Sequence, residues 1–308
     1  MSTTMQQMRT DIGLVHTIVA RSALSFIDGE NGVLEYVGYD IDCLARQSTF
    51  EETTFLLWNK RMPSRSELAD FTAQIRSNYE LSDRMWDIIV SLPRDASPMH
   101  ALRTLTSALS LEDPGADDPS EEANARKSLA MLAKMPALIA GYDRHRKGLD
   151  LIRPDVDCTI AENFLYMLNG EKPTDRMARA MDICLILHAD HGFNASTFAS
   201  LVTISTLSDM YSAVTTAIGT LKGPLHGGAN QGVMIMLQEI DGIDAVEAYV
   251  MDKLAKKSKI MGFGHRVYKA YDPRATYLKT FAEGIAEDTG NTSLFNLSKR
   301  IESIMDRE

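Results

Sequence analysis

Helical periodicity limits what this chain can fold into more than any other feature of its sequence. In segment 50–58 the apolar residues Phe50, Phe55, Leu57 and Trp58 recur at helical spacing, and two acids occupy the first turn, where the helix dipole favours negative charge. Further segments with helical periodicity are 66–79, 98–110, 121–141, 158–168, 174–191, 194–219, 226–239, 243–258, 273–288 and 292–306. They leave little room for strands, so the predicted fold class is mainly α.

The exception to this pattern lies near the N-terminus, in residues 23–40. There Asp28-Gly-Glu-Asn-Gly32 separates two stretches rich in Ile, Phe, Val and Tyr. Such residues favour strands, and a glycine-bearing turn between two of these stretches is typical of a hairpin. The sequence therefore predicts one short β-hairpin at about 23–40.

The charge of the chain narrows the choice of partners. Its net charge of −10 argues against nucleic acid, because proteins that follow a phosphate backbone carry a basic surface. A small anionic substrate responds to the local electrostatic field of its cleft rather than to the net charge of the chain. The net charge therefore does not exclude small anionic substrates. Basic residues do gather at 253–259, just before a glycine-rich segment.

The cysteines and the lengths of the apolar segments indicate the cellular compartment of the protein. Cys43, Cys158 and Cys184 are widely separated and include no Cys-x-x-Cys pair, so neither a disulfide framework nor a zinc knuckle is predicted. No apolar run approaches the roughly 20 residues that a membrane helix needs. We therefore expect a cytoplasmic protein with no membrane partner.

The segment Gly262–Arg274 is the most informative for chemistry. Its two glycines flank position 263 and let backbone approach a ligand closely, His265 follows them, and Arg274 can hold a carboxylate through two parallel hydrogen bonds. This combination suits a small anion with a polarisable carbonyl. Asp272 is interpreted as the cap of the helix that begins at the next residue, a proline.

A second glycine-rich turn, Gly223–Gln231, contains His226. A histidine at the start of a helix lies near the positive end of the dipole, which lowers its pKa and keeps the ring neutral. A neutral imidazole can donate one hydrogen bond to an enol oxygen. The alternative is that His226 caps the following helix between flexible glycines.

A third group of imidazoles is His188-Ala-Asp190-His191. The two histidines are expected three apart on one helix face, a spacing that also suits a metal. No further ligand motif accompanies them, so we expect buried histidines satisfied by hydrogen bonds and no metal site.

Seven segments, in order, resemble those of the citrate synthase family. They are Ile27–Gly32, Gly38–Asp40, Phe50–Glu52, Pro98–Met99 with Leu102–Arg103, His188–Asn194, Gly223–Gln231 and Gly262–Arg274. The last of these is highly specific, and the short length resembles the compact bacterial and archaeal branch. The resemblance implies a helical fold with a large domain, 1–222, and the start of a small domain, 223–308. It also implies a homodimer, or a higher oligomer, whose cleft closes over oxaloacetate before it admits acetyl-CoA.

The resemblance further implies a reaction of the tricarboxylic acid cycle, in which acetyl-CoA condenses with oxaloacetate and the citryl-CoA intermediate is hydrolysed to citrate and CoA. His226 would stabilise the enol of acetyl-CoA, and His265 would polarise and protonate the ketone of oxaloacetate. Acetyl-CoA would be a substrate, with no tightly bound cofactor. The implied residues for oxaloacetate are His191, Arg274 and Asn194, and those for acetyl-CoA are Lys259, Gly262, Phe263 and Gly264.

One expected group is missing from these 308 residues. Removal of a methyl proton from a thioester needs a positioned general base. In the family this is an aspartate in an Asn-Val-Asp-like segment after the helix of Arg274, and no such segment occurs here. Asp288 and Asp306 carry no matching motif. We expect a truncated chain that catalyses the condensation poorly. A degenerate relative that lost its base, or another carboxylate that replaces the base, would also explain why the segment is missing.

Two other functions compete with citrate synthesis. A 2-methylcitrate synthase would use propionyl-CoA in the same site, and one methylene is worth only about 1–3 kcal/mol in a pocket. A non-catalytic relative would keep the fold for self-assembly alone. The first alternative predicts a preference for propionyl-CoA over acetyl-CoA. The second predicts that oxaloacetate does not stabilise the folded chain against heat.

Overall fold

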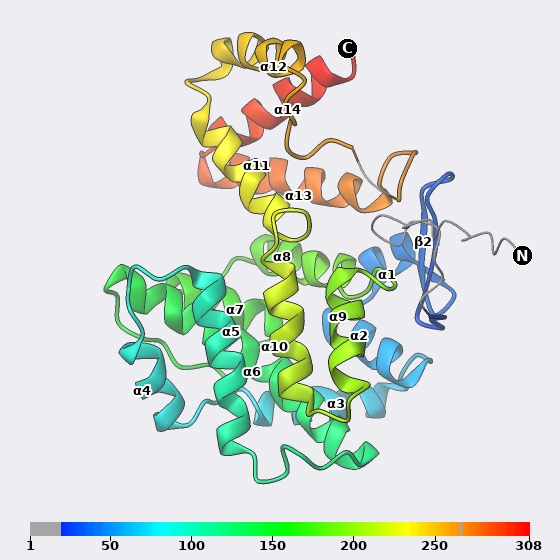
Figure 1. The fold of residues 1–308 in the computed structure, drawn as a ribbon, viewed down its shortest axis with the longest axis vertical. Coiled ribbons are helices and arrows are strands. Elements are labelled where there is room, and N and C mark those ends of the chain that lie inside the picture. Colours follow the sequence, from blue (N-terminus) through cyan, green and yellow to red (C-terminus); the bar gives the residue numbers. More distant parts are fainter. Residues whose placement is uncertain (1–19, 265–266) are drawn as a thin grey trace, which may run out of the picture.

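Helices supply most of the fold within residues 20–264 and 267–308, which are the residues that the computed structural model describes. The mainly α prediction is therefore confirmed (Figure 1). The strands are β1 (Ser25–Asp28), β2 (Val33–Tyr36) and β3 (Tyr39–Asp40). The α-helices are α1 (Ile41–Gln47), α2 (Phe50–Asn59), α3 (Arg65–Ser77), α4 (Asp83–Ser91), α5 (Pro98–Ala108), α6 (Glu121–Lys147), α7 (Ile160–Asn169), α8 (Asp175–Leu187), α9 (Ala195–Ile204), α10 (Met210–Leu221), α11 (Gly228–Glu239), α12 (Val246–Ala255), α13 (Pro273–Thr289) and α14 (Ser293–Met305). Two short 3-10 helices are η2 (Leu109–Glu112) and η3 (Ile243–Ala245).

The predicted hairpin is present and is extended by a third strand. β1 pairs antiparallel with β2, and Asp28 closes their turn by accepting hydrogen bonds from the backbone of Glu30 at 3.0 Å and Asn31 at 3.2 Å. β3 then pairs with β2. Val37 and Gly38 both have positive φ, which reverses the chain within two residues.

Two expected helices end earlier than the sequence indicated. The segment 194–219 is two helices, α9 and α10, because Leu207 adopts a left-handed φ of 63° and Asp209 caps α10 by accepting from the backbone N–H of Ser212 at 2.9 Å. The segment 174–191 ends at Leu187, and His188 is the residue that closes α8. The interpretation of His188 and His191 as neighbours on one helix face was wrong.

Two helices, α1 and α4, lie outside the predicted segments. α4 begins at a clear signal, since the hydroxyl of Ser82 accepts from the backbone N–H of Met85 at 3.1 Å and the buried residues Met85, Trp86 and Ile89 follow at helical spacing. α1 is only 7 residues long, too short for a periodic pattern to stand out.

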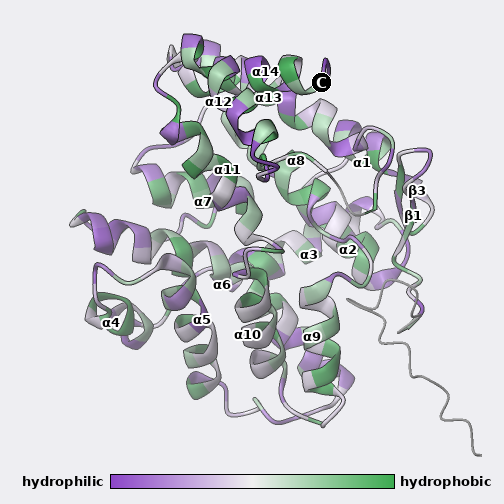
Figure 2. Cartoon of the chain, turned by 45° about the horizontal axis from the view of Figure 1, so that its top comes forward, coloured by the Kyte–Doolittle hydropathy of each residue, from purple (hydrophilic) through white to green (hydrophobic). Residues whose placement is uncertain are grey.

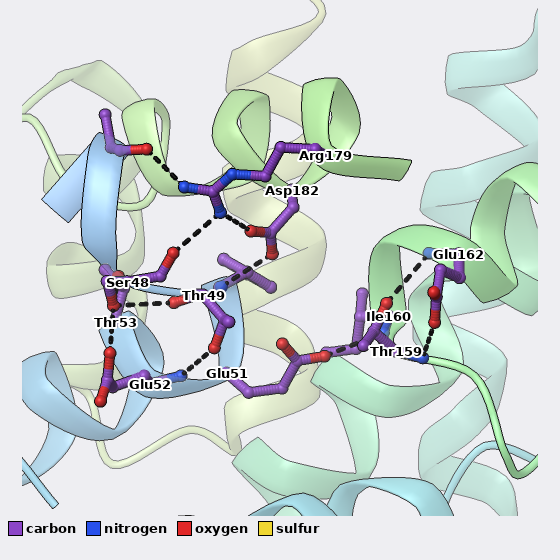
Figure 3. A network of polar contacts seen from close by, with 12 residues as sticks. Ser48, Thr49, Glu51, Glu52, Thr53, Thr159, Ile160, Glu162, Arg179 and Asp182 are labelled. Atoms are coloured by element: carbon purple, nitrogen blue, oxygen red, sulfur yellow. Dashed lines mark hydrogen bonds and ion pairs between the residues drawn. The ribbon is translucent and has the colours of Figure 1, made fainter. Parts of the chain in front are cut away.

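Remote carboxylates tie α2, α7 and α8 together (Figure 3). Glu51 accepts from the backbone N–H of Ile160 at 2.9 Å, and Asp182 accepts from that of Phe50 at 2.8 Å. Each bond satisfies a donor at the first turn of a helix, which otherwise has no partner within its own helix. Asp182 also accepts from Arg179 at 2.6 Å, so a guanidinium balances part of this buried negative charge.

Buried apolar side chains form three clusters. The first joins β2, α1, α2 and α8, the second lies around α4, α5 and α6, and the third consists of residues between 233 and 305. Figure 1 shows α11 to α14, in yellow to red, gathered at one end of the molecule. α13 packs against the first cluster through Tyr277, Leu278 and Phe281, and Arg176 of α8 donates to the backbone oxygen of Gly284 at 3.1 Å. None of the described helices combines the length and the apolar character that a membrane crossing requires.

Candidate active site

His191 lies in the turn that follows α8. Asp190 shapes this turn by accepting from the backbone N–H of Gly192 at 3.0 Å, and Gly192 has a φ of 61°. His188 faces its own helix, with Nδ1 2.6 Å from the backbone oxygen of Cys184. Across the described ranges, no group of three or more His, Cys, Asp and Glu side chains is arranged to hold a metal ion.

Tyr268 connects the His191 turn to the glycine-rich segment. Its hydroxyl lies 3.1 Å from Nε2 of His191, and the two rings meet edge to face with centroids 5.5 Å apart. The guanidinium of Arg274 lies over the same ring, 5.8 Å from its centroid. Burial raises the pKa of Tyr268 to about 12, so the hydroxyl keeps its proton at neutral pH. The structure thus brings together His191 and Arg274, two of the residues predicted to hold oxaloacetate.

Arg274 is fixed by Asp272 at the start of α13. Its Nη2 donates to Oδ2 of Asp272 at 2.7 Å and its Nε to Oδ1 at 2.9 Å. Oδ1 also accepts from the backbone N–H of Arg274, so the predicted cap is confirmed. Burial acts to lower the pKa of Arg274, but the bonds to Asp272 outweigh it and leave the pKa raised. The guanidinium is therefore a permanent, largely buried positive charge.

His226 lies between α10 and α11 and contacts a residue that the sequence did not indicate. Its Nε2 is 2.8 Å from the hydroxyl of Ser196, in the first turn of α9. The N-cap of α11 is Gly227, and no side chain caps that helix. Ser196 carries no motif of its own, and the one available signal was its place two residues after Asn194.

Asn194 acts as the N-cap of α9. Its side-chain oxygen accepts from the backbone N–H of Ser196 at 2.9 Å and of Thr197 at 3.1 Å. This cap fixes Ser196, and through it His226. His191 and Ser196 are five residues apart, a separation of at most about 18 Å along the chain, so one short segment serves both imidazoles.

The residues predicted to contact acetyl-CoA lie before α13. Gly262 and Gly264 have φ of 93° and 79°, backbone conformations that side-chain-bearing residues rarely adopt, and Phe263 between them is 38% exposed. Lys259 precedes them by three residues. The predicted catalytic residue His265 lies outside the described residues, directly after Gly264.

Together, fold and site define a mainly helical protein with glycine-flanked histidines and a buried arginine suited to a small carboxylate. The family model described as citrate synthase, C-terminal domain, matches residues 13–308, and the chain belongs to the citrate synthase family.

Individual relatives agree with this assignment. The chain is 47% identical to a citrate synthase of Deinococcus radiodurans over 95% of this chain and 78% of that protein. It is 42% identical to a 2-methylcitrate synthase of Mycobacterium tuberculosis over 90% of this chain and 70% of that one. Among solved structures, the citrate synthase of Thermoplasma acidophilum, in a ternary complex with carboxymethyl coenzyme A and oxaloacetate, superposes with a TM-score of 0.91 at 31% identity, covering 97% of this chain and 79% of that one.

Proposed function

We propose that this chain carries the site of a citrate synthase, an acyltransferase that condenses acetyl-CoA with oxaloacetate and water to give citrate and CoA. The observation that carries the proposal is the convergence of His191 and Arg274 on Tyr268, in a chain 47% identical to a citrate synthase. Oxaloacetate is a dicarboxylate with a ketone, which matches a buried cation beside imidazoles. No tightly bound cofactor is part of the proposal.

Arg274 and His191 hold the carboxylates of oxaloacetate in this proposal. Arginine offers five N–H donors in a planar fork. The bonds to Asp272 use Nε and one hydrogen of Nη2, which leaves the hydrogens of Nη1 for a substrate oxygen. Fixing the guanidinium in advance reduces the entropy lost when the substrate binds.

His226 stabilises the enol of acetyl-CoA. The hydroxyl of Ser196 has one hydrogen and two neighbours, Nε2 of His226 at 2.8 Å and the backbone oxygen of Ala217 at 3.0 Å. The carbonyl oxygen of Ala217 can only accept, so the hydroxyl donates to it in this arrangement. We propose that with acetyl-CoA bound the hydroxyl turns its hydrogen to Nε2, which places the proton of the neutral ring on Nδ1. Nδ1 then donates to the thioester oxygen as negative charge develops on it.

His265 polarises the ketone of oxaloacetate and protonates it as the carbon-carbon bond forms. The left-handed glycines at 262 and 264 allow the backbone of this loop to approach a ligand. Phe263, between these glycines, and Lys259, three residues before Gly262, would contact acetyl-CoA.

The general base is the group that the described site does not supply. The sequence has no Asn-Val-Asp-like segment, and Asp288 is paired with Arg176 at 3.1 Å on the surface between α8 and α13. We propose that the 308-residue chain by itself catalyses the condensation of acetyl-CoA with oxaloacetate poorly. Thiol release in the presence of oxaloacetate and acetyl-CoA, corrected for each substrate alone and for the protein thiols, tests this, and turnover equal to that of a longer citrate synthase would contradict it.

Propionyl-CoA is the second candidate substrate, because a 2-methylcitrate synthase is among the relatives at 42% identity. The reaction differs by one methyl group on the nucleophilic carbon. A comparison of thiol release with acetyl-CoA and propionyl-CoA decides between them. A chain that self-associates but shows no thermal shift with oxaloacetate would instead be a non-catalytic relative.

We also propose that the chain forms a homodimer through α9 and α10. No residue of α9 is buried, although it is rich in apolar side chains, and Figure 2 shows it largely green. Val202 is 53% exposed and Leu207, in the turn between the two helices, is 93% exposed. A contiguous exposed apolar face of this kind marks an interaction surface.

The division into domains and the location complete the proposal. The third core cluster, formed by residues between 233 and 305, supports a small domain in 223–308 and a large one in 1–222. A cytoplasmic location and a role in the tricarboxylic acid cycle follow from the proposed activity and from the free thiols of all three cysteines. Fractionation of the source cells with an antibody to the chain checks the location.

A further inference from the structure

The β1–β2 hairpin contacts both segments of the candidate site, although it lies about 160 residues before the first of them. Its turn, residues 28–32, touches the loop that follows His265. Its second strand ends at Tyr36, which touches the turn that holds His191. Figure 1 shows this proximity, with the orange loop before α13 reaching β2.

The contact with the loop is made through backbone. The oxygen of Gly29 accepts from the backbone N–H of Lys269 at 2.8 Å and of Ala270 at 3.4 Å. A Cβ added at Gly29 would lie 2.0 Å from the backbone oxygen of Val267, and one at Gly32 would lie 2.9 Å from that of Tyr271. Loop and turn are therefore packed too closely for any side chain at position 29.

Gly29 is a glycine because of this approach and not because of its own conformation. Unlike Gly32, with a φ of 69°, it is not among the glycines with positive φ. An alanine there would be compatible with the backbone of the turn itself. The methyl group would instead clash with the loop. The nearest atom is the backbone oxygen of Val267, and no change of rotamer can move a backbone atom away.

The second contact is made by a buried hydroxyl. Tyr36 is fully buried, and its oxygen lies 3.1 Å from the backbone oxygen of Ile186, 2.9 Å from that of Asp190 and 3.2 Å from the backbone nitrogen of Asp190. Burial raises the pKa of Tyr36 to about 12, so it remains a donor at neutral pH. It fastens the end of α8 to the turn of His191.

We propose that the β1–β2 hairpin fixes the distance between the His191 turn and the loop 267–271, and that Gly29 is a positioning residue for oxaloacetate binding, a role that rests on the proposed function. Tyr268 lies in this loop, next to the residues that bond to Gly29, and its hydroxyl contacts His191. A shift of this loop moves Tyr268 relative to His191. Misplacement by about 1 Å can reduce the rate of a reaction on the order of a hundredfold.

The test compares Gly29→Ala with Asn31→Ala in the 308-residue chain. Asn31→Ala is the matched control, because it removes a 2.6 Å bond from Nδ2 to Asp28 within the same turn. Hydrogen exchange of peptides covering 267–271 reports on the loop, and calorimetric titration reports on oxaloacetate. We expect Gly29→Ala to speed exchange in the loop and to weaken oxaloacetate binding at least about tenfold. Asn31→Ala should change binding less than about twofold.

Several results would overturn the inference. Unchanged exchange in 267–271 would show that the turn does not fix the loop, and faster exchange with unchanged oxaloacetate affinity would reduce Gly29 to a structural role. Equal losses in both variants would point to general damage to the hairpin. If wild type does not bind oxaloacetate, the proposed function fails, and exchange alone decides whether the hairpin fixes the loop.

A second variant covers the case in which Gly29→Ala does not fold. Glu30→Gln removes the ion pair between Glu30 and Lys269, which joins the same turn to the same loop at an exposed position. Exposed pairs contribute little to global stability, so this variant keeps the fold. We expect a modest rise in exchange confined to 267–271, and a rise spread over the whole chain would contradict the inference.

Discussion

The guanidinium of Arg274 and the carboxylate of Asp272 make two hydrogen bonds, of 2.7 and 2.9 Å, at the first turn of α13. The Arg274 side chain is only 15% exposed, so this cation is neutralised within the protein before any substrate arrives. A substrate carboxylate must use the hydrogens that Asp272 leaves. Asp272 thus has two functions, as helix cap and as partner of the cation.

Asp272→Asn separates these two functions. Asparagine caps a helix about as well as aspartate, but it leaves Arg274 without a counter-charge. We expect the free energy of unfolding without ligand to fall by about 2 kcal/mol, because a largely buried charge loses its partner. The rise in unfolding temperature caused by oxaloacetate should increase, since the substrate then supplies the missing negative charge. Thermal unfolding with and without oxaloacetate measures both effects.

The control for this variant is Asp288→Asn on the same helix. Asp288 pairs with Arg176 at the surface, where both side chains are about half exposed, so its loss should change stability little. A smaller oxaloacetate shift in Asp272→Asn would show that Asp272 mainly orients the guanidinium.

Contacts between distant segments explain which parts of the site the sequence could predict. The cap at Asp272 acts locally, and the structure confirms it; the glycines at 262 and 264 also act locally, and both have positive φ. Tyr268 and Ser196 were missed, because they meet His191 and His226 across 77 and 30 positions of the chain. No local pattern encodes such a contact.

The fold shows the same division between local and distant information. The hairpin was predictable because its turn glycines and β-rich flanks are adjacent. The break between α9 and α10 was not, because it depends on Leu207 in a left-handed conformation that leucine rarely adopts. Apolar periodicity continues through that break, so the pattern alone favoured one helix.

Ser196→Ala tests the tautomer assigned to His226. Without the hydroxyl, Nε2 of His226 lacks the donor that, in the proposed complex with acetyl-CoA, places the ring proton on Nδ1. With acetyl-CoA bound, we expect nitrogen NMR of histidine-labelled protein to show His226 protonated on Nδ1 in wild type and a mixture of tautomers in the variant. Ser200→Ala is the control, because Ser200 lies one turn later on α9 and bonds only to backbone oxygens. A proton on Nε2 of wild type in the complex with acetyl-CoA would overturn the assignment.

Glu51→Gln tests the effect of a buried carboxyl on stability. Burial raises the pKa of Glu51, so the folded chain binds its proton more tightly than the unfolded chain does. The free energy of unfolding of wild type therefore falls as pH rises above about 4.3, the ordinary value for glutamate, through the raised folded value. Glutamine still accepts from the backbone of Ile160 but cannot ionise. We expect the variant to gain stability relative to wild type over that window in urea unfolding.

Glu67→Gln provides the opposite case. A hydrogen bond from Arg61 lowers the pKa of Glu67 to about 2, so its contribution to stability is present above the ordinary glutamate range and is lost as pH falls toward 2. Here wild type should gain relative to the variant as pH rises. Parallel pH profiles for the two variants would contradict the assignment of burial as the cause for Glu51.

Val202→Asp tests the proposed dimer face. Val202 is 53% exposed on α9, where no residue is buried within the chain, so a charge there costs the single chain little. In a dimer that buries this face, the same charge would lose its water without gaining a partner, which disfavours association by several kcal/mol. We expect light scattering to report a dimer for wild type and a monomer for the variant at micromolar concentration, with unchanged helical circular dichroism. Val156→Asp is the control, because Val156 is similarly exposed at 59% in the loop before α7, away from α9. A variant that remains dimeric would exclude α9 from the interface, and a wild-type monomer would remove the proposed dimer.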